Sequence, residues 1–237
     1  YGAYMAGEWH VGEKPAHWPR KRGFDRYFGL ISGASSYFEL LERGSRQIVL
    51  DDDPWEPPAQ GFYMTDATTD FAQQFLKEHF TKQPEKPFLL YMAYTAPHWP
   101  LHALPEDIAR YEKQYDEGWD KLRQTRFERM KALGVLTAKH ELSERPADLP
   151  AWEDIPNKAE WSRKMAVYAA MIDRMDQGIG RIVAQLKASG KLDNTLILFL
   201  SDNGGCHENL EGRKLNDPAV PIGERGSYGA YDPPWAY

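Results

Sequence analysis

The chain of 237 residues is long enough for one sizeable α/β domain. Its 42% hydrophobic and 27% charged residues are ordinary for a globular protein and exclude a collagen-like, coiled-coil or disordered chain. The net charge of −6 argues against a general nucleic-acid binder, because the phosphate backbone would be repelled, and no apolar run is long enough to span a bilayer.

The first sixty residues predict a region dominated by loops. Residues 1–35 are rich in Gly and aromatic side chains, and we expect loops around one short strand. Residues 36–50 alternate loosely between apolar and polar, which favours a hairpin with Gly44 near its turn. Residues 51–61 are acidic and Pro-rich, so we expect a loop there.

The next part of the chain predicts a helix followed by a buried strand. Residues 65–80 form an amphipathic pattern, for which Thr65 or Asp66 would supply the N-cap. Residues 88–94 are almost continuously apolar, a pattern typical of a strand covered on both faces. This strand would end in a loop that carries His98.

The second half of the chain begins with a mainly helical region. Residues 105–134 favour two helices separated by Gly118, and residues 137–156 favour a polar surface connection. A long helix is predicted after this connection. Its apolar positions recur at intervals of three and four residues: Trp161, Met165, Ile172, Met175, Ile179 and Ile182.

The long helix has recognisable ends, and a strand follows it. Asn157 would cap its first turn, and Gly190 would end it directly after Ser189. Residues 195–200, Thr-Leu-Ile-Leu-Phe-Leu, predict a second buried strand. Strand, helix and strand in this order indicate an α/β fold, with a mainly parallel sheet sandwiched between helices.

Two groups of polar residues follow the predicted buried strands, and ligands of such folds bind at the carboxyl ends of the strands. Asp202 and Asn203 come after the second strand, and their oxygens suit Ca²⁺ or Mg²⁺. The alternative is an ordinary turn, which Asp, Asn and Gly also favour. Two oxygen ligands do not complete a calcium site, so further ligands would have to come from elsewhere.

Two histidines are further candidates. His98 could act as a general acid or bind an anion, or it could be a loop histidine bonded to a nearby carbonyl. His102 could partner it, but no Cys/His grouping supplies the other ligands of a zinc site. His10 lies in a glycine-bracketed segment, residues 7–12, where backbone could approach a ligand, and it too could be an ordinary loop histidine.

The single cysteine and the chain ends say less about function. Cys206 excludes an intrachain disulfide, has no evident base near it in sequence, and is interpreted as a structural thiol. The chain starts at Tyr1 without a signal-peptide pattern and stops at Tyr237 in a turn-rich segment. We therefore expect an internal fragment of a longer protein.

Five segments, in order along the chain, resemble the sulfatase family of the alkaline phosphatase superfamily, and in particular bacterial arylsulfatases. Residues 7–12 (G-E-W-H-V-G) are similar to the G-K-W-H-L-G signature. The other four segments resemble R-G-F-D-x-F-F-G, P-F-x-L-Y-x-A-Y-x-A-P-H, Y-x-A-x-I-x-x-M-D and F-x-S-D-N-G-G: residues 22–29, 87–98, 168–176 and 198–205. On this resemblance, residues 1–237 would be the central part of a sulfatase catalytic domain, truncated at both ends.

The resemblance implies hydrolysis of sulfate esters by a formylglycine, made from the Cys or Ser of a C/S-x-P-x-R motif by a maturing enzyme. It implies that His10 and His98 are catalytic, and that Asp202 and Asn203 bind Ca²⁺, with Mg²⁺ as an alternative. It further implies a small-molecule or glycan sulfate ester as substrate and a periplasmic or secreted location. No nucleic acid or membrane segment is expected.

The chain departs from the family pattern at its nucleophile and at its sulfate-binding lysines. No C/S-x-P-x-R motif is present, and in the family it precedes the first of these five segments. A sulfate-binding lysine of the family would also lie beyond Tyr237. Glu8 occupies the place of the signature lysine, where a carboxylate would repel sulfate. Two alternatives therefore stay open: a phosphodiester or phosphonate hydrolase of the same superfamily, and a non-catalytic binder of sulfated glycans.

Overall fold

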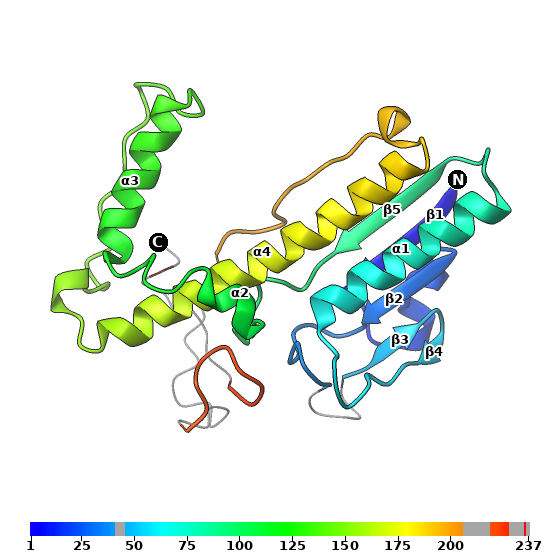
Figure 1. Cartoon of the computed structure of the whole chain (residues 1–237), viewed down its shortest axis with the longest axis horizontal. Coiled ribbons are helices and arrows are strands. Elements are labelled where there is room, and N and C mark those ends of the chain that lie inside the picture. Colours follow the sequence, from blue (N-terminus) through cyan, green and yellow to red (C-terminus); the bar gives the residue numbers. More distant parts are fainter. Residues whose placement is uncertain (41–45, 206–218, 228–234, 236–237) are drawn as a thin grey trace.

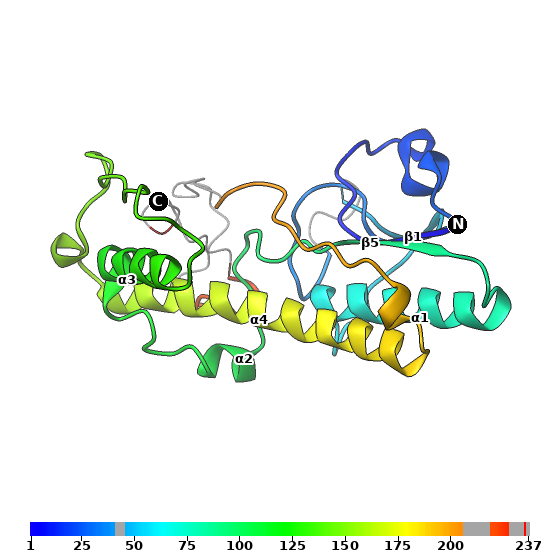
Figure 2. The ribbon, with the colours of Figure 1, turned by 90° about the horizontal axis from the view of Figure 1, so that it is seen from above.

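A computed structural model describes residues 1–40, 46–205, 219–227 and 235. A twisted sheet and the helix α1 (Met64–Lys82) lie at one end of an elongated molecule (Figure 1). The long helix α4 (Lys158–Ala188) runs from the sheet to the other end, where α3 (Gly118–Ala132) projects from it (Figures 1 and 2). No described helix is both long and apolar enough for a bilayer crossing.

The sheet has five strands, in the order β4-β3-β2-β1-β5. Its centre is parallel: β1 (Gly2–Gly7) pairs with β2 (Arg26–Leu30) on one side and with β5 (Phe88–Ala93) on the other. Two short antiparallel strands extend it, β3 (Ile48–Leu50) and β4 (Asp53–Pro54). The α/β fold with a mainly parallel core is confirmed.

The N-terminal region is more regular than the sequence pattern predicted. Residues 1–35 hold two strands instead of one, because the Gly-rich and aromatic stretches are paired in the centre of the sheet. The predicted hairpin over residues 36–50 is wrong, since β3 pairs with β2 and β4. The turn expected near Gly44 lies outside the described residues.

Helices and 3₁₀ helices cover the two faces of the sheet. The long helices α1 and α4 lie on one face, and η1 (Pro15–His17) and η2 (Pro19–Arg22) lie on the other (Figure 2). Side chains alternate accordingly along the strands. Tyr4, Phe28 and Leu30 pack toward α1, whereas Met5, Tyr27 and Val49 pack around Trp18 between the 3₁₀ helices.

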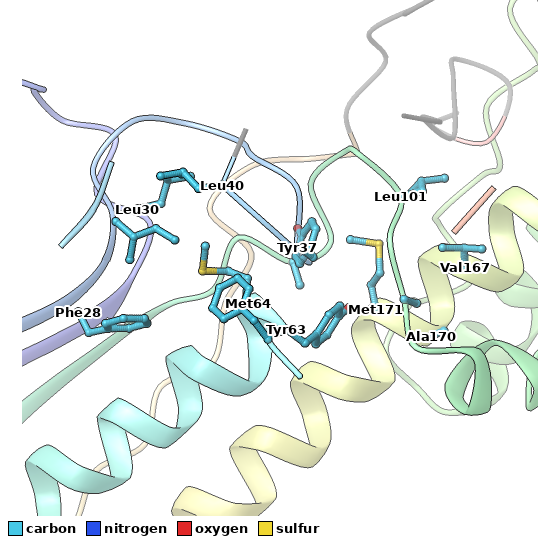
Figure 3. Close-up of a cluster of buried hydrophobic side chains, with 14 of the residues drawn as sticks. Phe28, Leu30, Tyr37, Leu40, Tyr63, Met64, Leu101, Val167, Ala170 and Met171 are labelled. Atoms are coloured by element: carbon cyan, nitrogen blue, oxygen red, sulfur yellow. The ribbon is translucent and has the colours of Figure 1, made fainter. Parts of the chain in front are cut away.

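The buried core continues from the sheet into α4. Figure 3 shows Phe28, Leu30 and Met64 near the sheet, Tyr37 and Tyr63 in the middle, and residues of α4 beyond them. The α4 residues in this core are Ala166, Val167, Ala170 and Met171. This layer fixes the loops that leave the carboxyl ends of the strands.

The helix α1 starts at Met64, and Tyr63 is its N-cap residue. The prediction that Thr65 or Asp66 caps it is wrong, because both lie inside the first turn. The Asp66 carboxylate pairs instead with Arg174 of α4, with 2.6 Å between Oδ2 and Nη2. The Asp66 side chain, which the sequence pattern suggested as a helix cap, therefore forms an ion pair with another helix instead.

The strand β5 is not covered on both faces, as its apolar pattern had predicted. It is an edge strand among the described residues, and the side chains of Leu89 and Tyr91 are about half exposed. A continuous apolar run predicts burial but does not identify the neighbour that provides it.

The predicted buried strand at residues 195–200 is also wrong. The segment follows η4 (Leu192–Asn194), runs back in the direction of β5, and pairs with no described strand (Figures 1 and 2). Its apolar side chains are exposed, Leu196 by 83% and Phe199 by 77%. Apolar and β-branched residues favour a strand only where a neighbouring strand accepts their backbone hydrogen bonds.

The helices of the second half follow the predictions closely. The short helix α2 (Pro105–Ala109) and α3 are separate, with Gly118 as the first residue of α3, and η3 (Trp152–Asp154) interrupts a polar connection. Asn157 is the N-cap of α4, and Gly190 follows its end with φ of 65°. Of the six apolar positions expected on α4, only Ile182 is fully buried, since the core takes the neighbouring small residues.

His102 is a buried histidine that holds three loops together. Its Nδ1 accepts from the backbone N–H of Tyr37 at 3.3 Å, and its Nε2 donates to the carbonyl of Ser227 at 2.5 Å. Burial lowers the pKa of His102 to about 4, although the bond to Ser227 opposes that shift. The ring is therefore neutral in the folded protein near neutral pH, and it does not form the pair with His98 that its spacing suggested.

We expect the neutral His102 to make the protein sensitive to acid. A folded-state pKa of about 4 lies below the unfolded value of about 6.5, so its stabilisation is complete above pH 6.5 and is lost as pH falls toward 4. From pH 7 to 4.5 the full-length protein should lose about 2 kcal/mol more unfolding free energy than His102→Gln or His102→Asn. Urea titrations at both pH values measure this; identical losses in the parent and both variants would contradict it.

Candidate active site

The carboxyl ends of β1 and β5 meet at one edge of the sheet. The last residues of the two strands, Gly7 and Ala93, are paired in register, and the N–H of Glu8 donates to the carbonyl of Ala93 at 2.7 Å. Gly7 has φ of 123°, and a Cβ there would collide with the Ala93 carbonyl. The close approach of the two strands therefore requires a glycine at position 7. The pairing of β1 with β5 also brings the start of the segment after Glu8 close to the start of the loop that carries His98.

Glu8 is a largely buried carboxylate at this edge. Its side chain is 16% exposed, and its Oε1 lies 3.4 Å from Nδ1 of His10. Its Oε2 is buried without a hydrogen-bond partner among the described residues. A buried carboxylate oxygen without a donor is energetically unfavourable, so this position either binds a further group or weakens the site.

His10 sits at the rim, in a conformation that few residues adopt. Its φ is 48°, its side chain is 69% exposed, and its N–H donates to the carbonyl of Ile31 at 3.0 Å. Its ring lies against the backbone of Gly33, where any Cβ would meet it. Since Nδ1 faces Glu8, Nε2 is the nitrogen left for a substrate.

His98 lies in the loop after β5, and its ring is held by the backbone. Its Nδ1 donates to the carbonyl of Trp99 at 2.7 Å, and its own carbonyl accepts from the hydroxyl of Tyr37 at 3.0 Å. The N–H of His98 closes the turn by donating to Thr95. These bonds leave Nε2 of His98 as the nitrogen that can exchange a proton with a ligand.

Tyr37 supports the His98 loop, and no sequence pattern identified it. Burial raises its pKa well above the ordinary value, with Tyr63 and then the Glu8 carboxylate adding to the effect. Burial likewise raises the pKa of Tyr27, again with a contribution from Glu8. Both hydroxyls therefore stay protonated and donate hydrogen bonds. The Glu8 carboxylate contributes to the raised pKa of both Tyr27 and Tyr37.

Asp202 and Asn203 make no bond to the two histidines in the part of the chain that the structure describes. They follow the unpaired segment 195–200, both are exposed, and no described hydrogen bond or ion pair joins them to Glu8, His10 or His98. The amide nitrogen of Asn203 donates to the carbonyl of Gly204 at 2.7 Å, and its Oδ1 has no hydrogen-bond partner among the described residues. Cys206 lies outside the described residues.

The donor set at Asp202 and Asn203 fits part of a hard-cation site. A free carboxylate and a free amide oxygen are ligands that Ca²⁺ accepts, but Ca²⁺ needs six to eight oxygens. Among the described residues no cluster of three or more His, Cys, Asp or Glu side chains could hold a metal ion. Asp202 and Asn203 thus have the ligand types that Ca²⁺ prefers, but two residues cannot complete its coordination shell.

Comparison with known proteins agrees with the five segments. The model of the sulfatase family matches residues 1–228. Over the whole chain, identity is 32% both to an uncharacterized sulfatase of Schizosaccharomyces pombe and to an arylsulfatase of Klebsiella aerogenes, of which 46% and 53% are covered. The chain thus spans about half the length of these relatives.

Solved structures agree with the fold. Among them is Ps i-CgsB in complex with k-i-k-neocarrahexaose, which matches with a TM-score of 0.58 and 26% identity. The match covers 96% of this chain and 43% of that one. The pairing of β1 with β5, the residues at their carboxyl ends and the family match over residues 1–228 lead to one conclusion: the chain belongs to the sulfatase family.

Proposed function

We propose that the full-length protein hydrolyses sulfate esters, and that residues 1–237 form the central part of its catalytic domain. The observation that supports this best is the shared edge of β1 and β5, from which the Glu8–His10 segment and the His98 loop both leave, in a chain of the sulfatase family. The substrate would be a small-molecule or glycan sulfate ester.

His98 would act as the general acid. Its Nδ1–H is bonded to the Trp99 carbonyl, so a proton gained at Nε2 is directed away from the loop and toward the ligand. Delivery of that proton to the ester oxygen prevents an alkoxide from leaving with a full negative charge. The Tyr37 hydroxyl keeps the loop in place and does not itself reach the reacting atoms.

His10 would act in the second step of the reaction, in which sulfate leaves the enzyme after the alcohol has departed. Its side chain is exposed at the rim, and its Nδ1 lies 3.4 Å from Oε1 of Glu8. His10 can therefore take up a proton at Nε2 when sulfate is eliminated. Its positive φ and its contact with Gly33 fix the ring at this place.

Two further groups belong to the proposal. Asp202 and Asn203 would hold Ca²⁺, or Mg²⁺, which when bound neutralises the charge on the sulfate oxygens. The nucleophile would be a formylglycine produced by a maturing enzyme, and the 237 residues contain no C/S-x-P-x-R motif for it. The test is release of inorganic sulfate from 4-nitrophenyl sulfate by the purified, matured full-length protein. Absence of release, with formylglycine and bound metal both verified, would overturn the proposal.

We expect Glu8→Lys in the full-length protein to raise kcat/KM for 4-nitrophenyl sulfate at least about tenfold, equivalent to roughly 1.4 kcal/mol. Sulfate is anionic and gains charge on its oxygens during transfer, so a cation at this position stabilises the transition state where a carboxylate repels it. The change removes the 3.4 Å contact of Oε1 with His10, whereas the buried Oε2 has no described partner to lose.

Glu8→Gln is the matched control, because it removes the charge while keeping the size of the side chain. Repulsion of sulfate by Glu8 predicts a smaller gain for Gln than for Lys. A loss of activity in both variants, with folding and formylglycine content unchanged, would instead mean that Glu8 assists His10.

A further inference from the structure

The molecule carries a basic projection, defined here as the basic arm: α3 and the return segment, residues 118–145. It stands away from the sheet, beyond the start of α4 (Figures 1 and 2). The arm contains seven Lys and Arg against four Asp and Glu, a net charge of +3. Since the whole chain carries −6, the remainder carries −9, and the arm is positive against a negative molecule.

The base of the arm is rigid. Trp119 is 3% exposed, and its ring packs edge-on against those of Trp152, Trp161 and Trp235, with centroid distances of 4.9, 5.5 and 5.3 Å. The carboxylate of Asp120 pairs with Arg145 and accepts from the N–H of Trp152. The arm is therefore held firmly at its base and extends into solvent from there.

Beyond its base, α3 buries almost nothing. Its buried residues are Gly118 and Trp119, the first two of the helix. A helix with polar residues all round gains little from packing and is expected to serve another purpose, such as contact with a partner. The polar surface of α3 therefore does not serve to form the core, and contact with a partner would account for it.

Three cations on α3 have no acidic partner among the described residues. Lys121, Arg126 and Arg129 are exposed and make no ion pair there. At about 100° per residue they fall within a sector of about 140° on the helix, so they present positive charge on one side. The acids next to them in sequence have other partners: Asp120 pairs with Arg145, and Glu128 accepts a hydrogen bond from Gln124 at 2.7 Å.

A shallow apolar hollow lies between α3 and the return segment. Its apolar lining is Phe127, Met130, Leu136 and Leu142, and its polar lining is Arg123, Arg126, His140, Ser143 and one acid, Glu141. Apolar surface next to cations matches a sugar ring, which has a C–H face and, when sulfated, anionic groups around it. Free inorganic anions would need only the charge.

We propose that the basic arm binds a sulfated polysaccharide chain away from the reacting ester. The proposal rests on the proposed function, because a hydrolase of sulfate esters meets such chains as substrates. The occupant follows from charge complementarity with the three cations and from the apolar hollow, which Arg126 lines. A nucleic acid is a polyanion too, so its binding is a contrary outcome of the test.

The test measures binding of dextran sulfate by the full-length protein at low ionic strength, with unmodified dextran as the neutral probe. Reversal of the three charges (Lys121→Glu, Arg126→Glu and Arg129→Glu together) should raise Kd for dextran sulfate at least about tenfold. Neutralisation of the same residues by Gln should give an intermediate Kd. Hydrolysis of 4-nitrophenyl sulfate should be unchanged in both variants, since the arm lies outside the catalytic edge.

The matched control reverses three exposed lysines at the other end of the molecule (Lys77→Glu, Lys86→Glu and Lys187→Glu), which changes the net charge equally. Kd should change less than twofold there. Equal weakening in both triple variants, binding of unmodified dextran, or equally tight binding of single-stranded DNA of matched charge would overturn the proposal. Binding by the arm in a protein that hydrolyses no sulfate ester would instead refute the proposed function alone.

Discussion

Asp202→Ala in the full-length protein should lower kcat/KM for 4-nitrophenyl sulfate at least about a thousandfold, a loss of roughly 4 kcal/mol. Asp202 supplies the one free carboxylate beside Asn203, and the bound cation would lose a charged ligand. The side chain is exposed and makes no described contact within the protein, so its removal should leave the fold intact. Calcium content, Tm and kcat/KM are measured on the same preparation.

Asp193→Ala is the control for Asp202→Ala. Asp193 is an exposed aspartate of η4 nine residues upstream, and its loss should change neither metal content nor turnover. If Asp202→Ala keeps its calcium and its rate, Asp202 is a turn residue, as the pattern Asp-Asn-Gly-Gly also allowed.

His98→Asn should slow the hydrolysis of an alkyl sulfate by about a hundredfold, and that of 4-nitrophenyl sulfate by less than about tenfold. An alkyl oxygen is strongly basic when it leaves and depends on a proton from the acid, whereas nitrophenolate leaves readily without one. Asn keeps a donor near the position of Nδ1, so the bond to the Trp99 carbonyl can be retained while Nε2 is removed.

The kinetic comparison separates an acid from a structural residue. A histidine that only supports the loop would slow both esters by the same factor when changed to Asn. His140→Asn, a change of the same kind at an exposed histidine bonded to Thr137, should affect neither ester. Equal slowing of both esters by His98→Asn would remove His98 from the acid role.

The sequence predicted elements best where local chemistry decides the structure. The long helix α4 was predicted within one residue at each end: Gly190, with φ of 65°, ends it locally, and Asn157 stands at its N-cap position without a side-chain capping bond. Its buried face was not, since the core takes Ala166, Val167, Ala170 and Met171, which also recur at intervals of three and four, so periodicity alone did not choose between two apolar faces of the helix. Small residues bury well only against a partner that the local pattern does not contain.

Predictions that depended on a neighbour were the ones that failed. The apolar runs of β5 and residues 195–200 indicated burial, yet one is an edge strand and the other pairs with no described strand. The same limit applies to the site. The family resemblance implied catalytic roles for His10 and His98, and the register of β1 with β5 brings the strand ends before them to one edge. Tyr37 could be found only from its bond to His98.

Turnover of three esters of 4-nitrophenol tests most directly whether the protein transfers a sulfate or a phosphate group. The matured full-length protein is assayed with 4-nitrophenyl sulfate, 4-nitrophenyl phosphate and bis(4-nitrophenyl) phosphate at equal concentration, pH and calcium. The leaving group is constant, so differences in kcat/KM report recognition of the transferred group. We predict that kcat/KM for the sulfate ester exceeds both others by at least about a hundredfold, or roughly 2.7 kcal/mol. Faster turnover of either phosphate ester would contradict the account and assign the protein to phosphate-ester hydrolysis.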